Sequence, residues 1–324
     1  MRPFLATLAG VWVAAAGAAY LYSRQSHIPW ALALTVLPAF LVEIAFYLAP
    51  GFEGARKAFD RLGNVWIRGT LLAVSAVIPY LLATLRTDSF SILSLVELAF
   101  AATVIAFWYA EGKRSLAADL LLLAIAAVVF ASGFFGHVYP KLAPRLPLDI
   151  LGKLMWIRLG IMAVLSIRGL DDAHFGFIPD RRDWRVGVEQ YLMFLPVGAA
   201  LAYFTGFARL HPMAEVWWRF PVKAAGLFLG ILWVVALGEE FFFRAFLQRE
   251  LARKLGNIAG LAAASLLFGA AHLWFRGFPN WRFALVAAAA GVFYGIALMR
   301  SGSVRAGMVT HALVVTTWRV LFSG

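Results

Sequence analysis

Two adjacent carboxylates and a guanidinium stand inside an otherwise apolar stretch of the sequence. The heptapeptide GEEFFFR, residues 238–244, lies within the apolar run 224–247. An ionisable group inside such a run costs about 2.5–3.5 kcal/mol by membrane-insertion scales, so each one needs a reason. At 3.6 residues per turn, Glu240 and Arg244 stand at i and i+4 on one helix face, where they can pair. Glu239 projects about 100° away and is left free to act as a base.

Two histidines follow, each among apolar neighbours. His272 ends the segment FGAAH and shares a helix face with Phe268, and His311 stands in the segment MVTHAL. With a rise of 1.5 Å per residue, Glu239, His311 and His272 lie about 14, 8 and 20 Å above the cytoplasmic ends of their predicted helices. Ordinary helix tilt or a shifted helix start could close this gap, so the arithmetic permits the three groups to meet without proving that they do.

These residue types suggest one chemistry. A glutamate beside a neutral histidine can share a water molecule and remove its proton, which makes a nucleophile for a peptide carbonyl. A second histidine could donate to the oxyanion that forms. The hypothesis is amide hydrolysis by water without a covalent intermediate. The alternative is structural: Glu240 and Arg244 form a pair that fixes helix packing, which leaves Glu239 unexplained.

The composition indicates that lipid surrounds the elements that hold these residues. Of 324 residues, 62% are hydrophobic and 14% are charged, against about 45–50% and 25% in ordinary globular proteins. The net charge of +12 is scattered between apolar runs and is not gathered on one face, so nucleic acid is not an expected partner. The absence of cysteine excludes thiolate zinc sites and a cysteine nucleophile.

The pattern predicts an all-α, polytopic transmembrane helical bundle with roughly eleven spans. Unpaired backbone groups are too costly in lipid for such long unalternating runs to be anything but helices. The C-terminal spans would form the catalytic core. The apolar runs lie near residues 4–22, 29–49, 67–85, 89–110, 116–136, 149–167, 188–207, 224–247, 258–274, 283–299 and 305–322.

Basic residues suggest an orientation and a division of the chain. Lys and Arg gather in the loops near 56–68, 181–185, 249–254 and 300–305, which the positive-inside tendency places in the cytoplasm. The N-terminus is then cytoplasmic and the C-terminus lies on the opposite side. We expect an N-terminal helical region at 1–147 and a catalytic region at 148–324, with its motifs within 224–318. The most polar stretch is 169–185.

Two further glutamates, Glu43 and Glu97, lie within apolar runs before residue 147. No motif surrounds either of them. We expect each to pair with a basic residue of a neighbouring helix.

The order of the C-terminal motifs resembles a known family. Glu-Glu-x-x-x-Arg at 239–244, Phe-x-x-x-His at 268–272 and a final His311 after a Ser-Gly-Ser turn resemble the CPBP family of intramembrane proteases. This family includes the type II CAAX prenyl endopeptidases and the Abi proteins. The resemblance covers roughly residues 224–318, about the last third of the chain.

The resemblance implies a CAAX-type endopeptidase with a cavity open to the cytoplasm. Glu239 and His272 would activate water, Glu240 and Arg244 would support and orient them, and His311 would contribute to the oxyanion site. In the family an Asn often stands four residues after the last His, where this chain has Val315. Thr310 and Thr316 are candidate substitutes for that donor.

Cofactor, partner and competing functions stay open at this point. Two Glu and two His could bind a divalent metal such as zinc, but Arg244 beside Glu240 would repel a cation, so we favour a glutamic protease without a cofactor. The expected partners are a membrane-associated protein or peptide substrate and the lipid bilayer. Neither the substrate's identity nor the oligomeric state is readable. The alternatives are a non-catalytic scaffold or immunity protein of the same fold and, third, a proton-coupled transporter.

Overall fold

The computed structural model describes residues 1–324 except 112–113, 171–173, 212–218, 276 and 324. The chain forms two compact units, Met1–Leu170 and Asp171–Gly324. Each unit is described below by itself.

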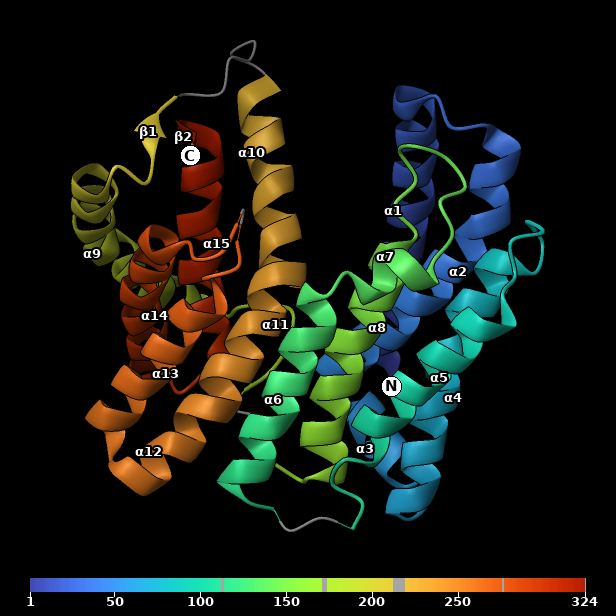
Figure 1. Cartoon of the computed structure of the whole chain (residues 1–324), viewed down its shortest axis with the longest axis horizontal. Coiled ribbons are helices and arrows are strands. Elements are labelled where there is room, and N and C mark those ends of the chain that lie inside the picture. The colour runs from blue at the N-terminus through green and yellow to red at the C-terminus, as the bar shows by residue number, and fades with distance from the viewer. Residues whose placement is uncertain (112–113, 171–173, 212–218, 276, 324) are drawn as a thin grey trace. The chain divides into compact units, whose positions relative to one another are not determined.

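Unit 1 consists of helices and their connections (Figure 1). Its long helices are apolar along most of their length, as spanning helices are. The elements are α1 (Arg2–Ser26), α2 (Trp30–Leu48), the 3-10 turn η1 (Ala49–Gly51), α3 (Glu53–Asp60), α4 (Val65–Thr84), α5 (Ile92–Phe107), α6 (Leu116–Ala131), α7 (Phe134–Val138), α8 (Asp149–Met162) and the π turn η2 (Ala163–Ile167).

Buried ion pairs join the helices of unit 1. Arg158 on α8 donates to both carboxylate oxygens of Glu43 on α2, at 2.7 and 3.2 Å, and to Ser75 on α4. Arg168 makes a second bidentate pair with Asp119 on α6. All four charged residues are buried. Because an unpaired charge in such a place is costly, the pairs fix which helices are neighbours.

The predicted partners of the two N-terminal glutamates can now be compared with the structure. The pairing of Glu43 with a basic residue of a neighbouring helix is confirmed by Arg158. Glu97 on α5 lies 3.4 Å from Nε2 of His137 on α7, a pair that carries opposite charges only when the histidine is protonated.

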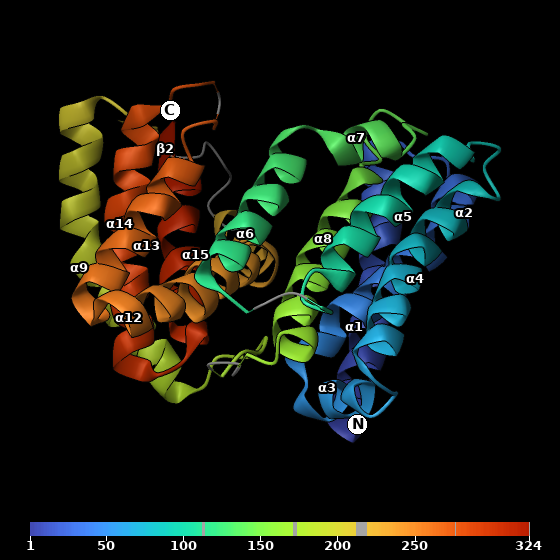
Figure 2. The same cartoon turned by 60° about the horizontal axis from the view of Figure 1, so that its bottom comes forward.

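Unit 2 contains the predicted catalytic motifs. Figure 2 shows α9, α13, α14 and α15 packed side by side. A continuous helical run, Arg219–Leu255, carries Glu239, Glu240 and Arg244. The elements are α9 (Arg181–Thr205), β1 (Arg209–Leu210), α10 (Arg219–Gly230), the π segment η3 (Ile231–Ala236), α11 (Leu237–Glu240), the π segment η4 (Phe241–Gln248), α12 (Arg249–Leu255), α13 (Asn257–Ala271), α14 (Trp281–Ser301), α15 (Val304–Leu321) and β2 (Phe322–Ser323), which pairs antiparallel with β1.

The all-α class is confirmed, whereas the count of eleven spans is not. Among the described residues, seven helices are long and apolar enough to cross a membrane. Helices α5, α6 and α13 have 16, 16 and 15 residues. At 1.5 Å per residue they reach about 22–24 Å, short of a hydrocarbon core of about 30 Å. The seven are Arg2–Ser26, Trp30–Gly51, Val65–Thr84, Asp149–Ile167, Arg181–Thr205, Arg219–Leu255 and Trp281–Ser301.

The two compact units divide inside the polar stretch 169–185, after Leu170. The expected division after residue 147 concerned where a catalytic region begins, and the compact units do not test that. They do assign α8 to unit 1, because α8 packs against α2, α4 and α5 and its Arg158 pairs with Glu43.

The Glu43–Arg158 pair makes a stability prediction. Arg158→Met leaves a carboxylate buried without its partner and should lower the free energy of unfolding by about 3–5 kcal/mol. The double variant Glu43→Leu/Arg158→Met removes both charges and should lose clearly less. Thermal and denaturant unfolding in detergent micelles measures both. Glu53→Gln, which breaks the exposed Glu53–Lys57 pair, is the control and should show no measurable loss. A double variant as unstable as Arg158→Met would contradict this account.

Candidate active site

The two adjacent glutamates stand where the long helix of unit 2 departs from regular α geometry. The short segment α11 carries both and is flanked by the π segments η3 and η4. Such π turns are rare and occur frequently at functional sites. The predicted separation of the two carboxylates is observed: the Glu240 side chain is fully buried, whereas the Glu239 side chain is 33% exposed.

Glu240 and Arg244 form the predicted i,i+4 ion pair, with 3.4 Å between Glu240 Oε2 and Arg244 Nε. Both side chains are fully buried. The guanidinium also lies over the ring of Phe268, 5.0 Å from its centre. Two glycines make room for the pair: a Cβ atom on Gly291 would come within 2.8 Å of Arg244 Nη2, and one on Gly307 within 2.9 Å of Glu240 Oε2.

His311 is bound to the other oxygen of Glu240. Its Nδ1 lies 2.8 Å from Glu240 Oε1, and the histidine is 3% exposed. An ionised carboxylate only accepts hydrogen bonds, so Nδ1 carries the proton and donates it. Nε2 of the same ring therefore points away from Glu240, and it lies 3.8 Å from Glu239 Oε2.

His272 does not lie inside its helix as the sequence suggested. Helix α13 ends at Ala271, and His272 is its C-cap residue. The last carbonyls of a helix have no backbone partner within it, and Nδ1 of His272 lies 2.7 Å from the carbonyl oxygen of Phe268. Since a carbonyl only accepts, Nδ1 donates this bond and Nε2 of the neutral ring keeps a free lone pair.

Glu239 lies close to both histidines. Its Oε2 lies 3.8 Å from Nε2 of His272 and 3.8 Å from Nε2 of His311. It makes no hydrogen bond to any residue that the structure describes. At 3.8 Å the contacts are too long for direct hydrogen bonds, so this buried oxygen is left without a hydrogen-bond partner among the described residues. The structure thus brings together all five predicted residues: Glu239, Glu240, Arg244, His272 and His311.

A metal would have three free donors at this place, Glu239 Oε2 and the two Nε2 atoms. These are donor types that catalytic zinc sites use. Within the described part of the chain, however, no group of three or more Asp, Glu and His side chains has the arrangement of a metal site. The buried cation of Arg244 lies next to Glu240, on which His311 depends.

Sequence reasoning missed a polar clasp, formed by Asp180, Asp183 and Arg305, that joins the start of α15, the helix that carries His311, to the start of α9. Arg305 lies 2.9 Å from the buried Asp183 and 3.2 Å from Asp180. Asp180 caps α9 by accepting from the backbone N–H groups of Arg182 and Asp183. The charges are visible in the sequence, but nothing in it indicates that residues more than a hundred positions apart meet.

Val315 lies one turn beyond His311 and is half-buried. Of the two threonines considered as substitutes, Thr310 uses its hydroxyl on backbone carbonyls of Gly187 and Ala306. Thr316 Oγ1 is buried and makes no hydrogen bond among the described residues. Five residues after His311, Thr316 points about 140° away from it around the helix, which does not suit an oxyanion donor.

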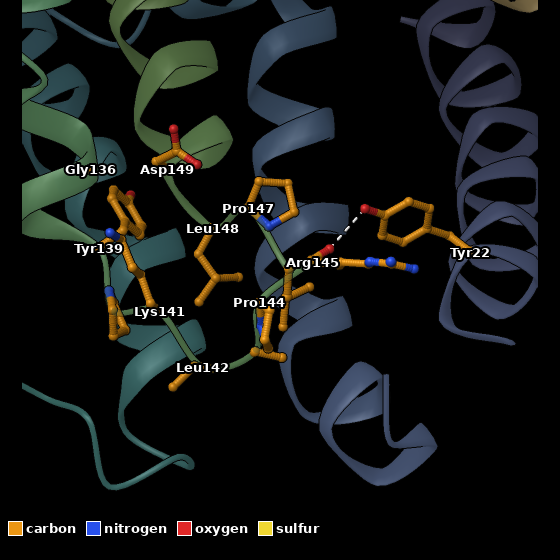
Figure 3. A pocket seen from close by; sticks show the side chains of 13 residues that line it. Tyr22, Gly136, Tyr139, Lys141, Leu142, Pro144, Arg145, Pro147, Leu148 and Asp149 are labelled. Carbon is orange, nitrogen blue, oxygen red and sulfur yellow. Dashed lines mark hydrogen bonds between the residues drawn. The ribbon is translucent and has the colours of Figure 1, made fainter. Parts of the chain in front are cut away.

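Two hollows in the described part of the chain are large enough to compare with this cluster, and both lie outside it. The larger, about 720 Å³, is in unit 1 beside the connection from α7 to α8, where the Tyr22 hydroxyl donates to the Arg145 carbonyl (Figure 3). None of the five predicted residues lines it. The smaller, about 90 Å³, is an apolar hollow between α9, α14 and α15, with Phe207 and Trp318 in its wall. Both rings contact Phe283, which in turn contacts His272.

Comparison with known proteins agrees with these motifs. Residues 221–317 match the model of the family described as type II CAAX prenyl endopeptidase Rce1-like. The match includes all five predicted site residues, and it confirms the resemblance to the CAAX protease family. No curated protein and no solved structure matches the chain. Residues 221–317 are thus similar to a CAAX-type protease domain, and the seven apolar helices among the described residues support an integral, multi-pass membrane protein.

The clasp makes a prediction about pH. The backbone N–H of Asp183 holds the pKa of Asp180 below its ordinary value of 3.8, helped by the N–H of Arg182 and by Arg305. A lowered folded-state pKa stabilises the fold fully above the unfolded pKa, and this stability is lost as pH falls through the lowered value. Asp180→Asn, which keeps the cap, should therefore flatten the fall in melting temperature between about pH 5 and 2. Identical slopes for wild type and variant would contradict the lowered pKa of Asp180.

Proposed function

We propose that this chain, which carries a CAAX-type protease domain, is an intramembrane endopeptidase that hydrolyses a peptide bond with water activated by Glu239 and His272. The substrate would be a membrane-associated protein or peptide. The single observation that carries the proposal is the position of Glu239 Oε2, 3.8 Å from each of two imidazole Nε2 atoms that come from different helices.

In the first step, a water molecule among these atoms attacks the carbonyl carbon of the scissile bond. Glu239 accepts one proton of this water, and the free Nε2 of His272 accepts a hydrogen bond from its other hydrogen. The carbon–oxygen bond that forms leaves a tetrahedral intermediate with a negative oxygen. When the carbon–nitrogen bond breaks, the proton passes to the leaving amine, so no covalent enzyme intermediate is needed.

His311 would stabilise the negative oxygen. Its Nδ1 proton is committed to Glu240, so Nε2 can donate only when the ring is an imidazolium. The Glu240 carboxylate holds Nδ1 of that ring, and Arg244 holds the carboxylate in place. Glu240 and Arg244 are therefore positioning residues that act through His311.

The catalytic roles are tested by substitution. Glu239→Gln and His272→Ala should lower kcat/KM by about 10²–10⁴-fold. His311→Ala should lower it by about 10²–10³-fold, the usual effect of one oxyanion donor. Glu189→Gln, on the exposed part of α9, is the matched control and should keep wild-type activity.

The readout is twofold. Cleavage of a farnesylated, internally quenched CAAX peptide is measured in micelles, and peptides of whole membranes are compared by mass spectrometry between cells with wild type and cells with Glu239→Gln. Folded Glu239→Gln protein with an unchanged rate and an unchanged peptide profile would favour a non-catalytic scaffold of the same fold.

We propose a glutamic mechanism without a metal. The buried guanidinium of Arg244 beside Glu240 supports this, because it would repel a cation bound next to it. Purified active protein should contain far less than one zinc per molecule, and chelator treatment should leave cleavage unchanged. One tightly bound zinc per active molecule, with activity lost to the chelator and restored by zinc, would overturn the assignment.

The substrate class is a further part of the proposal. The apolar hollow near Trp318 is linked to His272 through Phe283, which supports a substrate with an apolar segment close to the cleaved bond. A prenylated peptide is one such substrate. The farnesylated peptide is therefore measured beside its unprenylated counterpart, and equal kcat/KM values would remove prenyl recognition from the proposal.

We also propose that the N-terminus is cytoplasmic and the C-terminus lies on the opposite side, on the distribution of Lys and Arg. The chain has no cysteine, so any introduced cysteine is the sole labelling site. A membrane-impermeant maleimide should label Lys141→Cys in intact cells and Arg61→Cys only after permeabilisation. The reverse pattern would invert the orientation.

A further inference from the structure

Aromatic rings from two other helices enclose the imidazole of His311. Tyr294, on α14, stacks face to face with its imidazole, with 4.6 Å between ring centres and 10° between ring planes. Phe268 approaches it edge-on, at 6.0 Å and 87°. Tyr294 and Phe268 are each 2% exposed. Tyr294 carried no signal in the sequence, since it is an aromatic residue in an apolar helix.

These contacts determine where the two nitrogens of His311 point. The Glu240 bond fixes Nδ1 at 2.8 Å but allows the ring to turn about that contact. The outer torsion of a histidine side chain is broad, so a single hydrogen bond does not fix the ring plane. A flat ring packed against the imidazole face does, because rotation would drive the imidazole into it. Nε2 is then held toward Glu239 Oε2.

The contact uses the ring of Tyr294. Its hydroxyl takes no part in the stacking on His311. The backbone at Tyr294 is also close to α15: a Cβ atom on Gly307 would come within 3.3 Å of the Tyr294 carbonyl oxygen. The ring is thus held at a fixed distance from the helix that carries His311.

We propose that Tyr294 is a positioning residue for the hydrolytic reaction: its aromatic ring fixes the plane of His311, so that Nδ1 meets Glu240 while Nε2 faces the reacting water. This proposal rests on the proposed function. In this role Tyr294 does not contact the substrate, and its aromatic ring is needed but its hydroxyl is not.

Three variants test it on the farnesylated, internally quenched CAAX peptide. Tyr294→Phe keeps the ring and should retain kcat within about twofold. Tyr294→Leu keeps apolar bulk but loses the flat face, and should lower kcat by about 10- to 100-fold, the effect of a small misplacement of a reacting group, with KM unchanged. Phe293→Leu is the matched control: its ring lies on the same helix but contacts Phe194, so kcat should not change.

Each outcome is decisive once folding is checked by melting temperature and kcat is expressed per folded molecule. A Tyr294→Leu kcat equal to wild type would overturn the proposal. Equal losses for Tyr294→Phe and Tyr294→Leu would overturn it in favour of a role for the hydroxyl. If Phe293→Leu lowers kcat as much as Tyr294→Leu does, the loss reflects general packing of α14, and the proposal is overturned. Glu239→Gln is measured in parallel: if it cleaves normally, the proposed function fails, whereas if it is inactive and Tyr294→Leu is normal, only this inference fails.

Discussion

The arrangement of unit 2 around its site depends on one constraint, the burial of the Glu240 carboxylate. An ionised carboxylate without solvent contact costs several kcal/mol unless charges or hydrogen bonds surround it. Here Arg244 lies on one side, His311 Nδ1 on the other, and Gly307 leaves space for the oxygen between them. Because these partners come from two helices, the long helix and α15 are held at a fixed separation and register.

This constraint separates the two neighbouring glutamates. Glu240 has its partners within the protein, whereas Glu239, one position along the helix, keeps partial exposure and an oxygen that contacts no hydrogen-bond donor in the described chain. A carboxylate that faces two imidazoles at 3.8 Å without binding either is well placed to hold water instead. The buried Glu240–Arg244 pair and the proposed chemistry at Glu239 therefore both follow from the adjacent positions of the two glutamates on one helix.

The sequence was sufficient for the features that follow from spacing. The i,i+4 relation of Glu240 and Arg244, the free direction of Glu239 and the choice of His272 and His311 all rest on helix periodicity and on the cost of charge in an apolar run. Periodicity permits these residues to meet but does not predict that they do, because their meeting depends on how three helices pack.

Other features lie outside what periodicity can report. The π segments around Glu239 change the local helical turn, but no residue type in the sequence indicates them. Helix α13 ends at Ala271 although apolar residues continue beyond it. The count of eleven spans is not confirmed: it rests on apolar runs, whereas the helices inside three of those runs have only 15 or 16 residues and α15, in a fourth run, is not among the seven candidate spans. The stacking of Tyr294 on His311 depends on tertiary contact alone.

The central claim is that Glu239 and His272 act on one water molecule, and a double-variant cycle tests it most directly. Cleavage of the same peptide is measured for Glu239→Gln, His272→Ala and the variant that combines them. Groups that act as a unit are strongly non-additive, so the combined variant should be about as slow as the slower single variant. Losses that multiply would contradict the account, because they would mean that the two residues act on separate steps.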